Sequence, residues 1–267
     1  MKYNFDNLMF EITRKCNMAC CHCLRGPAQN KTMSKEVMLK TLRKVNYIHC
    51  VTFGGGEPTL SLDMIWYFID CCKMLDVEVG NFYIVTNGKR YHRELEDVCD
   101  ALYQLCTDNE ISGLTVSDDE FHREFQPNRS LFLKTRARYM YGEDMYYNEI
   151  AKYGDFEEIA KPYARFHDKE HNDYQFYGII NMGRAKENGL GQRKLIGDTV
   201  SVCCNDYNSD FINVSDANIY ITVDGDIINT CDCSYKEMKN YKIGDIDHFD
   251  DTFLKFLVPS DTSQCVA

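Results

Sequence analysis

The sequence has little of what marks membrane, exported or nucleic-acid-binding proteins. Its apolar runs are short and interrupted by charge, well below the roughly 20 apolar residues of a membrane-spanning helix. Its first residues, Met-Lys-Tyr-Asn-Phe, contain no apolar signal segment. Positive charge is also scarce, since 30 Lys and Arg face 41 Asp and Glu for a formal net charge of −11, which argues against nonspecific nucleic-acid binding. We therefore expect neither a membrane nor a nucleic acid among the partners of this chain.

Cysteine, by contrast, is abundant, with 14 residues in a chain of 267. Disulfides form in oxidising compartments, and a chain without export features is not expected to reach one. The sequence thus predicts free thiols, a reducing cytoplasm, and an organism sheltered from oxygen.

The densest group of thiols lies between Cys16 and Cys23, with Cys16, Cys20 and Cys23 at positions i, i+4 and i+7 and Cys21 between them. Three thiolates this close in sequence repel one another unless a metal ion or cluster compensates their charge. An iron–sulfur cluster held by three cysteines, with one iron left open, fits the spacing best. Structural zinc, which prefers four ligands in two pairs, and a chance grouping in a cysteine-rich chain are the alternatives.

A second motif, three glycines at 54–56 followed by Glu57 and Pro58, comes directly after an apolar run at 49–53. Consecutive glycines remove the side chains that would keep a ligand from the backbone, and they permit positive φ. A simple tight turn is the other interpretation of such a run. The order of the two motifs decides between them.

CxxxCxxC just after a first strand, with GGGEP about 30 residues later, resembles the radical S-adenosylmethionine (SAM) superfamily. The resemblance implies that Cys16, Cys20 and Cys23 hold a four-iron four-sulfur (4Fe-4S) cluster. The fourth iron would bind the amino and carboxylate groups of SAM. It further implies that Gly55, Gly56 and Glu57 receive the SAM amino group.

The same resemblance extends the predicted SAM site to His22 in the cysteine motif, Asn87 in a Thr-Asn-Gly strand ending, Ser117 and Asp118 after the next strand, and Met182 and Arg184 at a Gly-Arg-Ala loop. Ser117 and Asp118, with Asp119 as the fallback, would accept hydrogen bonds from ribose hydroxyls; the alternative is that they cap the next helix. Arg184 would pair with the SAM carboxylate, or else be ordinary surface charge.

Apolar periodicity predicts alternating strands and helices over residues 1–195. The expected strands are 8–13, 49–53, 81–85, 111–116, 145–153 and 174–182, and the expected helices are 35–48 with Ser34 as N-cap, 62–75, 90–106, 130–140 and one starting at 155–158. Near-continuous apolar strands are typical of a parallel sheet, and ligands collect at its carboxyl edge. The fold class expected is α/β, a partial (β/α)6 TIM-like barrel that is open on one side.

Residues 196–267 differ in character and resemble the C-terminal extension called SPASM, or its shorter twitch version. A hairpin is expected over 218–228, turning at Asp224 and Gly225, with a strand near 243–246 and an acidic tail helix beyond. Four cysteines of this region, Cys203, Cys204, Cys231 and Cys233, could hold one auxiliary iron–sulfur cluster. A degenerate extension without metal is the alternative, because the usual later cysteines are missing.

The mechanism implied by the resemblance is reductive cleavage of SAM to methionine and a 5′-deoxyadenosyl radical, which abstracts hydrogen from a substrate. Enzymes with such extensions frequently modify peptides or protein side chains, so peptide maturation is the expected function. The expected partners are an electron donor such as flavodoxin or ferredoxin and a separate leader-binding protein, because the barrel begins almost at once. The alternatives are a glycyl-radical-enzyme activase and a non-catalytic iron–sulfur or zinc-binding regulatory protein.

Overall fold

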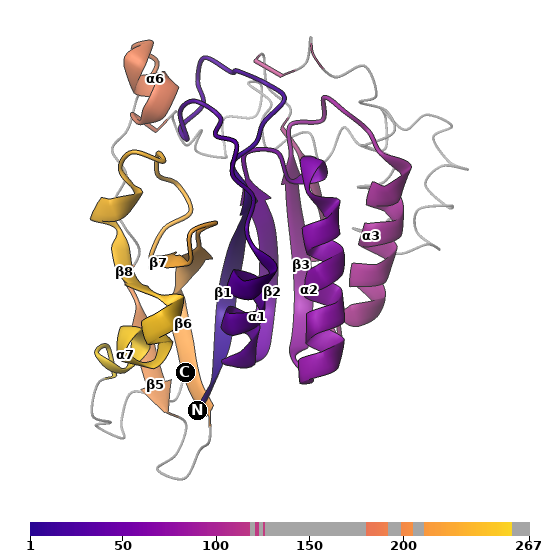
Figure 1. Ribbon diagram of the computed structural model, residues 1–267, viewed down its shortest axis with the longest axis vertical. Helices are drawn as coiled ribbons and strands as arrows, with labels where there is room; N and C mark the ends of the chain where they lie inside the picture. The colour runs from indigo at the N-terminus through magenta and orange to yellow at the C-terminus, as the bar shows by residue number, and fades with distance from the viewer. Residues whose placement is uncertain (118–120, 123–124, 126–179, 192–198, 205–210, 258–267) are drawn as a thin grey trace.

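The structure, a computed structural model, describes residues 1–117, 121–122, 125, 180–191, 199–204 and 211–257. Its centre is an eight-stranded sheet with the order β4-β3-β2-β1-β6-β7-β8, in which β5 pairs with β6 (Figure 1). The strands are β1 (Lys2–Thr13), β2 (Val45–Gly55), β3 (Glu78–Thr86), β4 (Gly113–Val116), β5 (Ser201–Cys204), β6 (Phe211–Ile221), β7 (Asp226–Ile228) and β8 (Lys242–Asp245). The sheet is open, which confirms the predicted α/β class.

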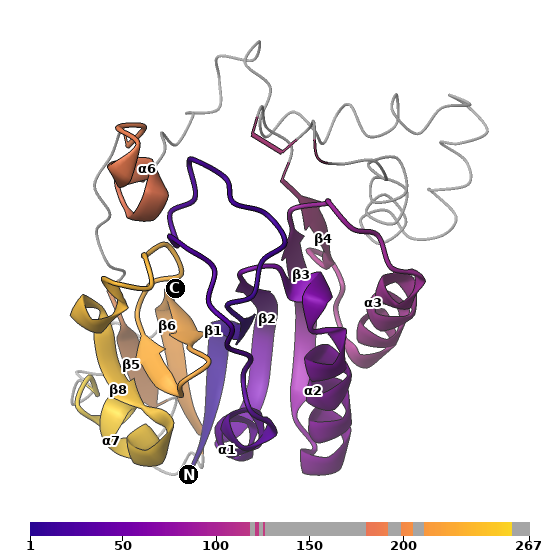
Figure 2. The same ribbon diagram turned by 45° about the horizontal axis from the view of Figure 1, so that its top comes forward.

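Strands β1 to β4 are parallel, and each connection between them carries a helix. These helices are α1 (Lys35–Arg43), α2 (Leu62–Leu75) and α3 (Arg93–Leu105), and Figures 1 and 2 show them side by side along one face of the sheet. Aromatic rings join the two layers, since Phe68 of α2 packs edge-on against Phe10 and Phe53. The carboxyl ends of the parallel strands therefore share one edge of the sheet.

The helix expected over 62–75 is present with those bounds, whereas the one expected over 35–48 is too long. The Ser34 side chain accepts a hydrogen bond from Val37 N, as an N-cap does, but α1 ends at Arg43. Val45 and Ile48 continue its apolar periodicity, yet both belong to β2, where Val45 pairs with Tyr3. Strand pairing with β1 overrides the local helical pattern there.

A second correction concerns the strand beside β1. The expected hairpin is present, with Tyr220 opposite Ile228 and its turn at Asp224 and Gly225. Its first strand, β6, also runs parallel to β1 and extends the barrel sheet on the side away from β2. The expected elements at 130–140, 145–153 and 155–158, and most of the strand at 174–182, lie outside the described residues. The division into 1–195 and 196–267 stays a prediction, although one sheet contains strands from both parts.

A short helix, α7 (Phe249–Leu254), packs at the amino end of the sheet. Its Phe249 and Phe253 rings lie against Tyr3 and Phe5 of β1, and all four side chains are buried. Burial of such rings contributes about 1.5–3 kcal/mol each. Apolar packing thus stabilises the amino end of the sheet. The polar side chains described below lie at the opposite end, the carboxyl edge of the parallel strands. Within the described ranges, no helix has the length and apolar character needed to cross a bilayer.

Candidate functional site

The loop that carries the cysteine motif begins where β1 ends and covers the carboxyl edge of the sheet (Figure 2). The glycine run closes against it. Gly56 N donates to the carbonyl oxygen of Thr13 at 2.7 Å, and Glu57 N donates to that of Lys15 at 2.8 Å. Two motifs about 40 residues apart in sequence are therefore bonded backbone to backbone.

This approach is so close that it excludes side chains at two of the three glycines. A Cβ on Gly55 would lie 2.1 Å from Thr13 O, and one on Gly56 would lie 2.2 Å from Lys15 O. Gly55 also has a φ of 123°, which only glycine adopts without strain. A Cβ on Gly54 would meet nothing within 4 Å. Glycine is therefore required at positions 55 and 56 for the close backbone packing against Thr13 and Lys15, independently of any ligand.

Glu57 is buried and binds the ends of β2 and β3 together. Its Oε1 accepts hydrogen bonds from Thr59 N at 3.2 Å and from the hydroxyls of Thr59 and Thr86, each at 2.6 Å. Its Oε2 accepts one, from Asn87 N at 2.7 Å. Burial raises the pKa of Glu57, and the hydrogen bonds oppose that rise. Since a carboxylate oxygen can accept two hydrogen bonds, Oε2 keeps room for one further donor.

Asn87, the predicted SAM residue that follows β3, connects Glu57 to the first cysteine. Its Nδ2 lies 3.6 Å from Cys16 Sγ and donates to Asn17 Oδ1 at 2.9 Å. Lys89 Nζ donates to the carbonyl oxygen of Asn17 at 2.9 Å. The start of the cysteine motif is thus held from the end of β3.

The three predicted ligand thiols are half-buried at this edge, whereas Cys21 is exposed. Burial raises the pKa of Cys16, and nearby negative charge from Glu57, Cys23 and Cys20 raises it further, against a hydrogen bond from Met18 N. The three thiols are therefore close enough to interact. In the described part of the chain, no three His, Cys, Asp or Glu side chains are arranged to hold a single metal ion.

Two residues that the sequence reasoning missed, Phe121 and His122, meet the cysteine motif from beyond β4. The His22 ring stacks on Phe121 with ring centroids 4.2 Å apart, and it lies edge-on to His122 at 5.1 Å. His122 is buried, and its Nε2 is 3.5 Å from Cys20 Sγ. The signal available was their place just after a parallel strand, where functional side chains gather. Ser117 donates its backbone N–H to Thr86 O, while Asp118 and Asp119 lie outside the described residues.

The Gly-Arg-Ala segment forms α6 (Gly183–Glu187), which packs on the cysteine loop. Arg184 N donates to Cys23 O at 2.9 Å, and Asn188 Nδ2 donates to Cys21 O at 2.9 Å. A Cβ on Gly183, whose φ is 51°, would lie 2.3 Å from Leu24 O. Met182 is buried beside Tyr220 and Cys233. The predicted SAM residues of this segment thus adjoin the loop through backbone contacts.

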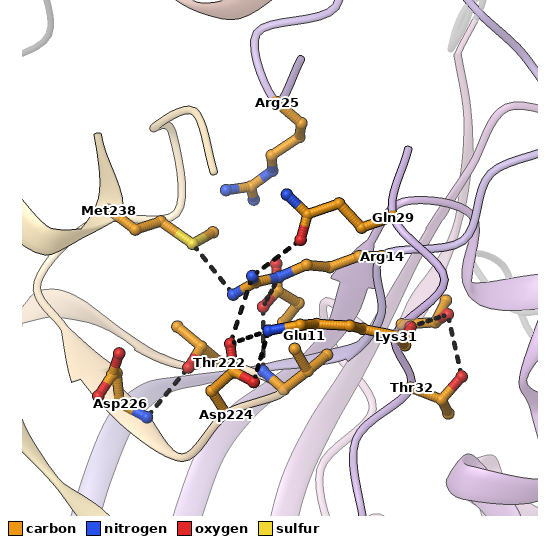
Figure 3. A network of polar contacts seen from close by, with 12 residues as sticks. Glu11, Arg14, Arg25, Gln29, Lys31, Thr32, Thr222, Asp224, Asp226 and Met238 are labelled. Atoms are coloured by element: carbon orange, nitrogen blue, oxygen red, sulfur yellow. Dashed lines mark hydrogen bonds and ion pairs between the residues drawn. The ribbon is translucent and has the colours of Figure 1, made fainter. Parts of the chain in front are cut away.

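A polar network below the loop, drawn in Figure 3, ties both ends of the cysteine loop to the C-terminal part of the chain. Arg14 Nε lies 2.9 Å from Glu11 Oε2, and its Nη1 lies 3.4 Å from Asp224 Oδ2. Glu11 Oε2 also accepts a hydrogen bond from Val223 N at 3.0 Å. At the other end of the loop, Arg25 Nη1 donates to Cys233 O at 3.0 Å. The sequence reasoning assigned no role to Glu11, Arg14 or Arg25.

The four cysteines expected to form an auxiliary site belong to two segments of the chain, β5 and the loop after β7. Cys203 and Cys204 lie on β5, opposite Asn213 and Ile212 near the amino end of β6. Cys233 packs beside Tyr220, seven residues further along β6, which is roughly 20 Å away. β5 pairs with β6 at the end remote from the loop after β7, an arrangement that does not favour one cluster on all four, and the auxiliary cluster stays a prediction.

In a comparison with known protein families, one segment of the chain matches a family model. Residues 10–132 match the model of the radical SAM superfamily, over the part of the chain that contains both motifs. Over this segment the chain is similar to the radical SAM superfamily. Mycofactocin maturase MftC of Mycobacterium ulcerans (strain Agy99) is 33% identical over 93 residues, which are 33% of this chain and 24% of the maturase. Putative protein YfkA of Bacillus subtilis (strain 168) is 31% identical over 67 residues, 24% of this chain and 18% of YfkA. The matched segments thus span a quarter or less of these relatives.

Among solved structures, native anSMEcpe with bound AdoMet and Cp18Cys peptide is similar with a TM-score of 0.51 at 14% identity. The alignment covers 98% of this chain and 81% of that one. The same protein with AdoMet and the Kp18Cys peptide gives a TM-score of 0.50 at 13% identity, covering 95% and 82%. At such low identity the likeness concerns the fold, an open α/β barrel.

The match to the radical SAM superfamily implies a 4Fe-4S cluster and SAM. The residues present fit these groups. The three predicted ligand cysteines share one loop at the sheet edge, and cysteine thiolates are the usual ligands of a 4Fe-4S cluster. Glu57, whose charge acts on Cys16, accepts at Oε2 one hydrogen bond from the described residues.

Proposed function

We propose that this chain is a radical SAM enzyme that abstracts a hydrogen atom from a peptide or protein side chain. The observation that carries the proposal is the bonding of the cysteine motif to the glycine motif and to Asn87 at one edge of the sheet. The naming of the mycobacterial relative as a maturase supports a peptide substrate. So does a fold shared with a protein that binds AdoMet and a peptide.

In this proposal Cys16, Cys20 and Cys23 hold the cluster. The SAM contacts would be His22, Gly55, Gly56, Glu57, Asn87, Ser117, Asp118, Met182 and Arg184. When bound, cluster and SAM supply one-electron cleavage of SAM to a hydrogen-abstracting 5′-deoxyadenosyl radical.

The protein's own contribution is positioning. Glu57 offers the free lone pair of Oε2 to the SAM ammonium group, while its other hydrogen bonds keep the carboxylate still. Asn87 fixes the start of the cysteine loop, and α6 fixes its end. Packing of Phe121 and His122 on His22 shields that side of the loop from water.

The proposal includes three further parts. The enzyme acts in the cytoplasm, a flavodoxin or ferredoxin reduces its cluster, and a separate protein recognises the leader of the peptide substrate. Anaerobic reconstitution tests the core of it. We expect about four irons per chain, and 5′-deoxyadenosine on addition of dithionite and SAM. Stoichiometric zinc without iron would instead favour a binding protein, and iron without any SAM cleavage would exclude the enzyme.

A further inference from the structure

One of the predicted cluster ligands is in contact with His122, in the segment that follows β4. The His122 side chain is buried, and its Nε2 lies 3.5 Å from Cys20 Sγ, within hydrogen-bonding distance of a sulfur atom. Buried imidazole nitrogens are nearly always hydrogen-bonded. His122 therefore has as a partner the same thiol that the proposed cluster would use as a ligand.

The segment that carries His122 is joined to the cysteine loop at two further points. The His122 ring lies edge-on to the His22 ring, with the ring centroids 5.1 Å apart. The His122 carbonyl oxygen accepts a hydrogen bond from Phe125 N at 2.9 Å. Lys89, whose Nζ is 5.7 Å from the centroid of the Phe125 ring, donates to the carbonyl oxygen of Asn17. Several contacts therefore hold the imidazole beside the cysteine loop.

The direction of the hydrogen bond between His122 and Cys20 follows from the chemistry of a cluster ligand. A cysteine binds iron as its thiolate, which has no proton to donate. The contact between Nε2 and Sγ is then a hydrogen bond only if Nε2 carries a proton and donates it. Imidazole has a proton on Nε2 in one of its two neutral tautomers and in its charged form. In the cluster-loaded protein, His122 is therefore the donor and Cys20 the acceptor.

A second ligand sulfur lies near a side-chain donor of the same kind. Cys16 Sγ is 3.5 Å from Met18 N and 3.6 Å from Asn87 Nδ2. Asn87 directly follows β3, and His122 comes after β4, the strand that pairs with β3. Segments that follow two neighbouring strands thus each bring one side-chain nitrogen to a sulfur of the cysteine motif.

Hydrogen bonds to the ligand sulfurs are among the properties that set the reduction potential of an iron–sulfur cluster. A donor stabilises the form with more negative charge on sulfur, and that form is the reduced cluster. The stabilisation is stronger at a buried site than in water, because the local dielectric constant is low. We propose that His122 donates a hydrogen bond from Nε2 to the Cys20 sulfur and thereby makes the cluster easier to reduce. His122 acts through Cys20 and is a positioning residue.

This inference rests on the proposed function, in which Cys20 binds the cluster. Its test is an anaerobic redox titration of the iron-loaded protein, followed by EPR spectroscopy of the reduced cluster. His122→Phe keeps a ring beside His22 but removes the donor, so the equilibrium constant for reduction should fall about tenfold, a shift of about 59 mV to lower potential. His122→Gln keeps an N–H donor and should restore most of the loss. The control is His49→Phe, at an exposed histidine on β2, which should leave the potential unchanged.

An unchanged potential in His122→Phe would overturn the inference, and so would equal shifts in the Phe and Gln variants, which would show a purely structural effect. A second measurement uses the wild-type protein with isotopically labelled histidine nitrogens. Pulsed EPR should detect weak coupling between the reduced cluster and one imidazole nitrogen, and this coupling should be absent from His122→Gln. No coupling in the wild type, coupling that persists in His122→Gln, or the strong coupling of an imidazole bound to iron would each refute the inference.

The proposed function fails separately, through the absence of SAM cleavage by a wild-type protein that holds the cluster and shows the coupling. SAM cleavage by a protein whose reduction potential does not respond to His122→Phe would leave the enzyme proposal intact and reject this inference alone. A wild-type protein that holds no cluster after reconstitution would reject both.

Discussion

Two groups of cysteines in this chain show how differently one residue type can be used. Cys16, Cys20 and Cys23 lie half-buried in a loop held by hydrogen bonds and ion pairs, with other thiols and a carboxylate nearby. Another four, Cys71, Cys72, Cys99 and Cys106, are buried in the apolar core between the sheet and the helices, and Cys50 is buried on β2. Free cysteine behaves as a small apolar side chain in such a core. Cysteine count alone therefore says little, and the surroundings of each thiol decide its role.

The largest effect should come from the loop thiols. Serine at Cys16, Cys20 or Cys23 removes one cluster ligand, so we expect iron content to fall from about four to near zero and 5′-deoxyadenosine formation to be lost. Cys21→Ser is the matched control because Cys21 is an exposed neighbour in the same loop, and it should keep both. Iron analysis after anaerobic reconstitution makes the comparison. Retention of iron in Cys20→Ser would contradict the ligand assignment.

The ion pair that anchors the loop should come next. Arg14→Gln leaves the fully buried Glu11 without its nearest cation, and breaking a buried pair from one side costs about 3–5 kcal/mol. Urea denaturation measures the loss. The control is Arg43→Gln, at an exposed cation on α1, which should change stability by less than about 0.5 kcal/mol. If Arg14→Gln and Arg43→Gln lowered the free energy of unfolding by similar amounts, the pairing of Arg14 with Glu11 would contribute no specific stabilisation.

Alkylation rates should show how strongly burial suppresses the reactivity of the core thiols, relative to a free cysteine peptide added as the reference. Burial raises the pKa of Cys50 to about 11 and that of Cys106 to about 12. Because the thiolate reacts, Cys50 at pH 8 should react with iodoacetamide about 100-fold more slowly than an ordinary thiol with a pKa near 8.5. Its rate should rise about tenfold per unit up to pH 10, while that of the ordinary thiol levels off. Mass spectrometry of native, metal-free protein gives both rates, and equal rates at pH 8 would remove the distinction.

The smallest effect should come from a core thiol. Cys72→Ser places a hydroxyl in an apolar site on α2, which should cost about 1–3 kcal/mol. Iron content after reconstitution should not change, because this thiol lies in the helix layer away from the loop. Chemical denaturation and iron analysis of one preparation check both statements. If Cys72→Ser lost iron without a change in stability, Cys72 would belong with the cluster ligands and not with the buried core thiols.

Prediction from sequence succeeded where local pattern and tertiary pairing agree. The bounds of α2, the Ser34 cap and the turn at Asp224 and Gly225 follow from apolar spacing and turn chemistry. It failed at residues 45–48, where a helical periodicity lies in a strand, because pairing with β1 is not visible locally. The sequence analysis grouped Cys203 and Cys231 as possible ligands of one cluster. The pairing of β5 with β6 places Cys203 opposite Asn213, whereas Cys231 lies in the loop after β7.

By itself, the sequence determined the resemblance to the radical SAM superfamily and the two motifs of the candidate site, since ligand spacing and glycine content are local properties of the chain. Only the tertiary structure decided that Gly55 and Gly56 pack against the cysteine loop, that His122 approaches Cys20, and that the carboxylate of Glu11 pairs with Arg14 beneath that loop. The physical reason is that each of these facts depends on which strands pair and in which register. Register is set by the burial of whole faces of a sheet, and no short stretch of sequence contains that information.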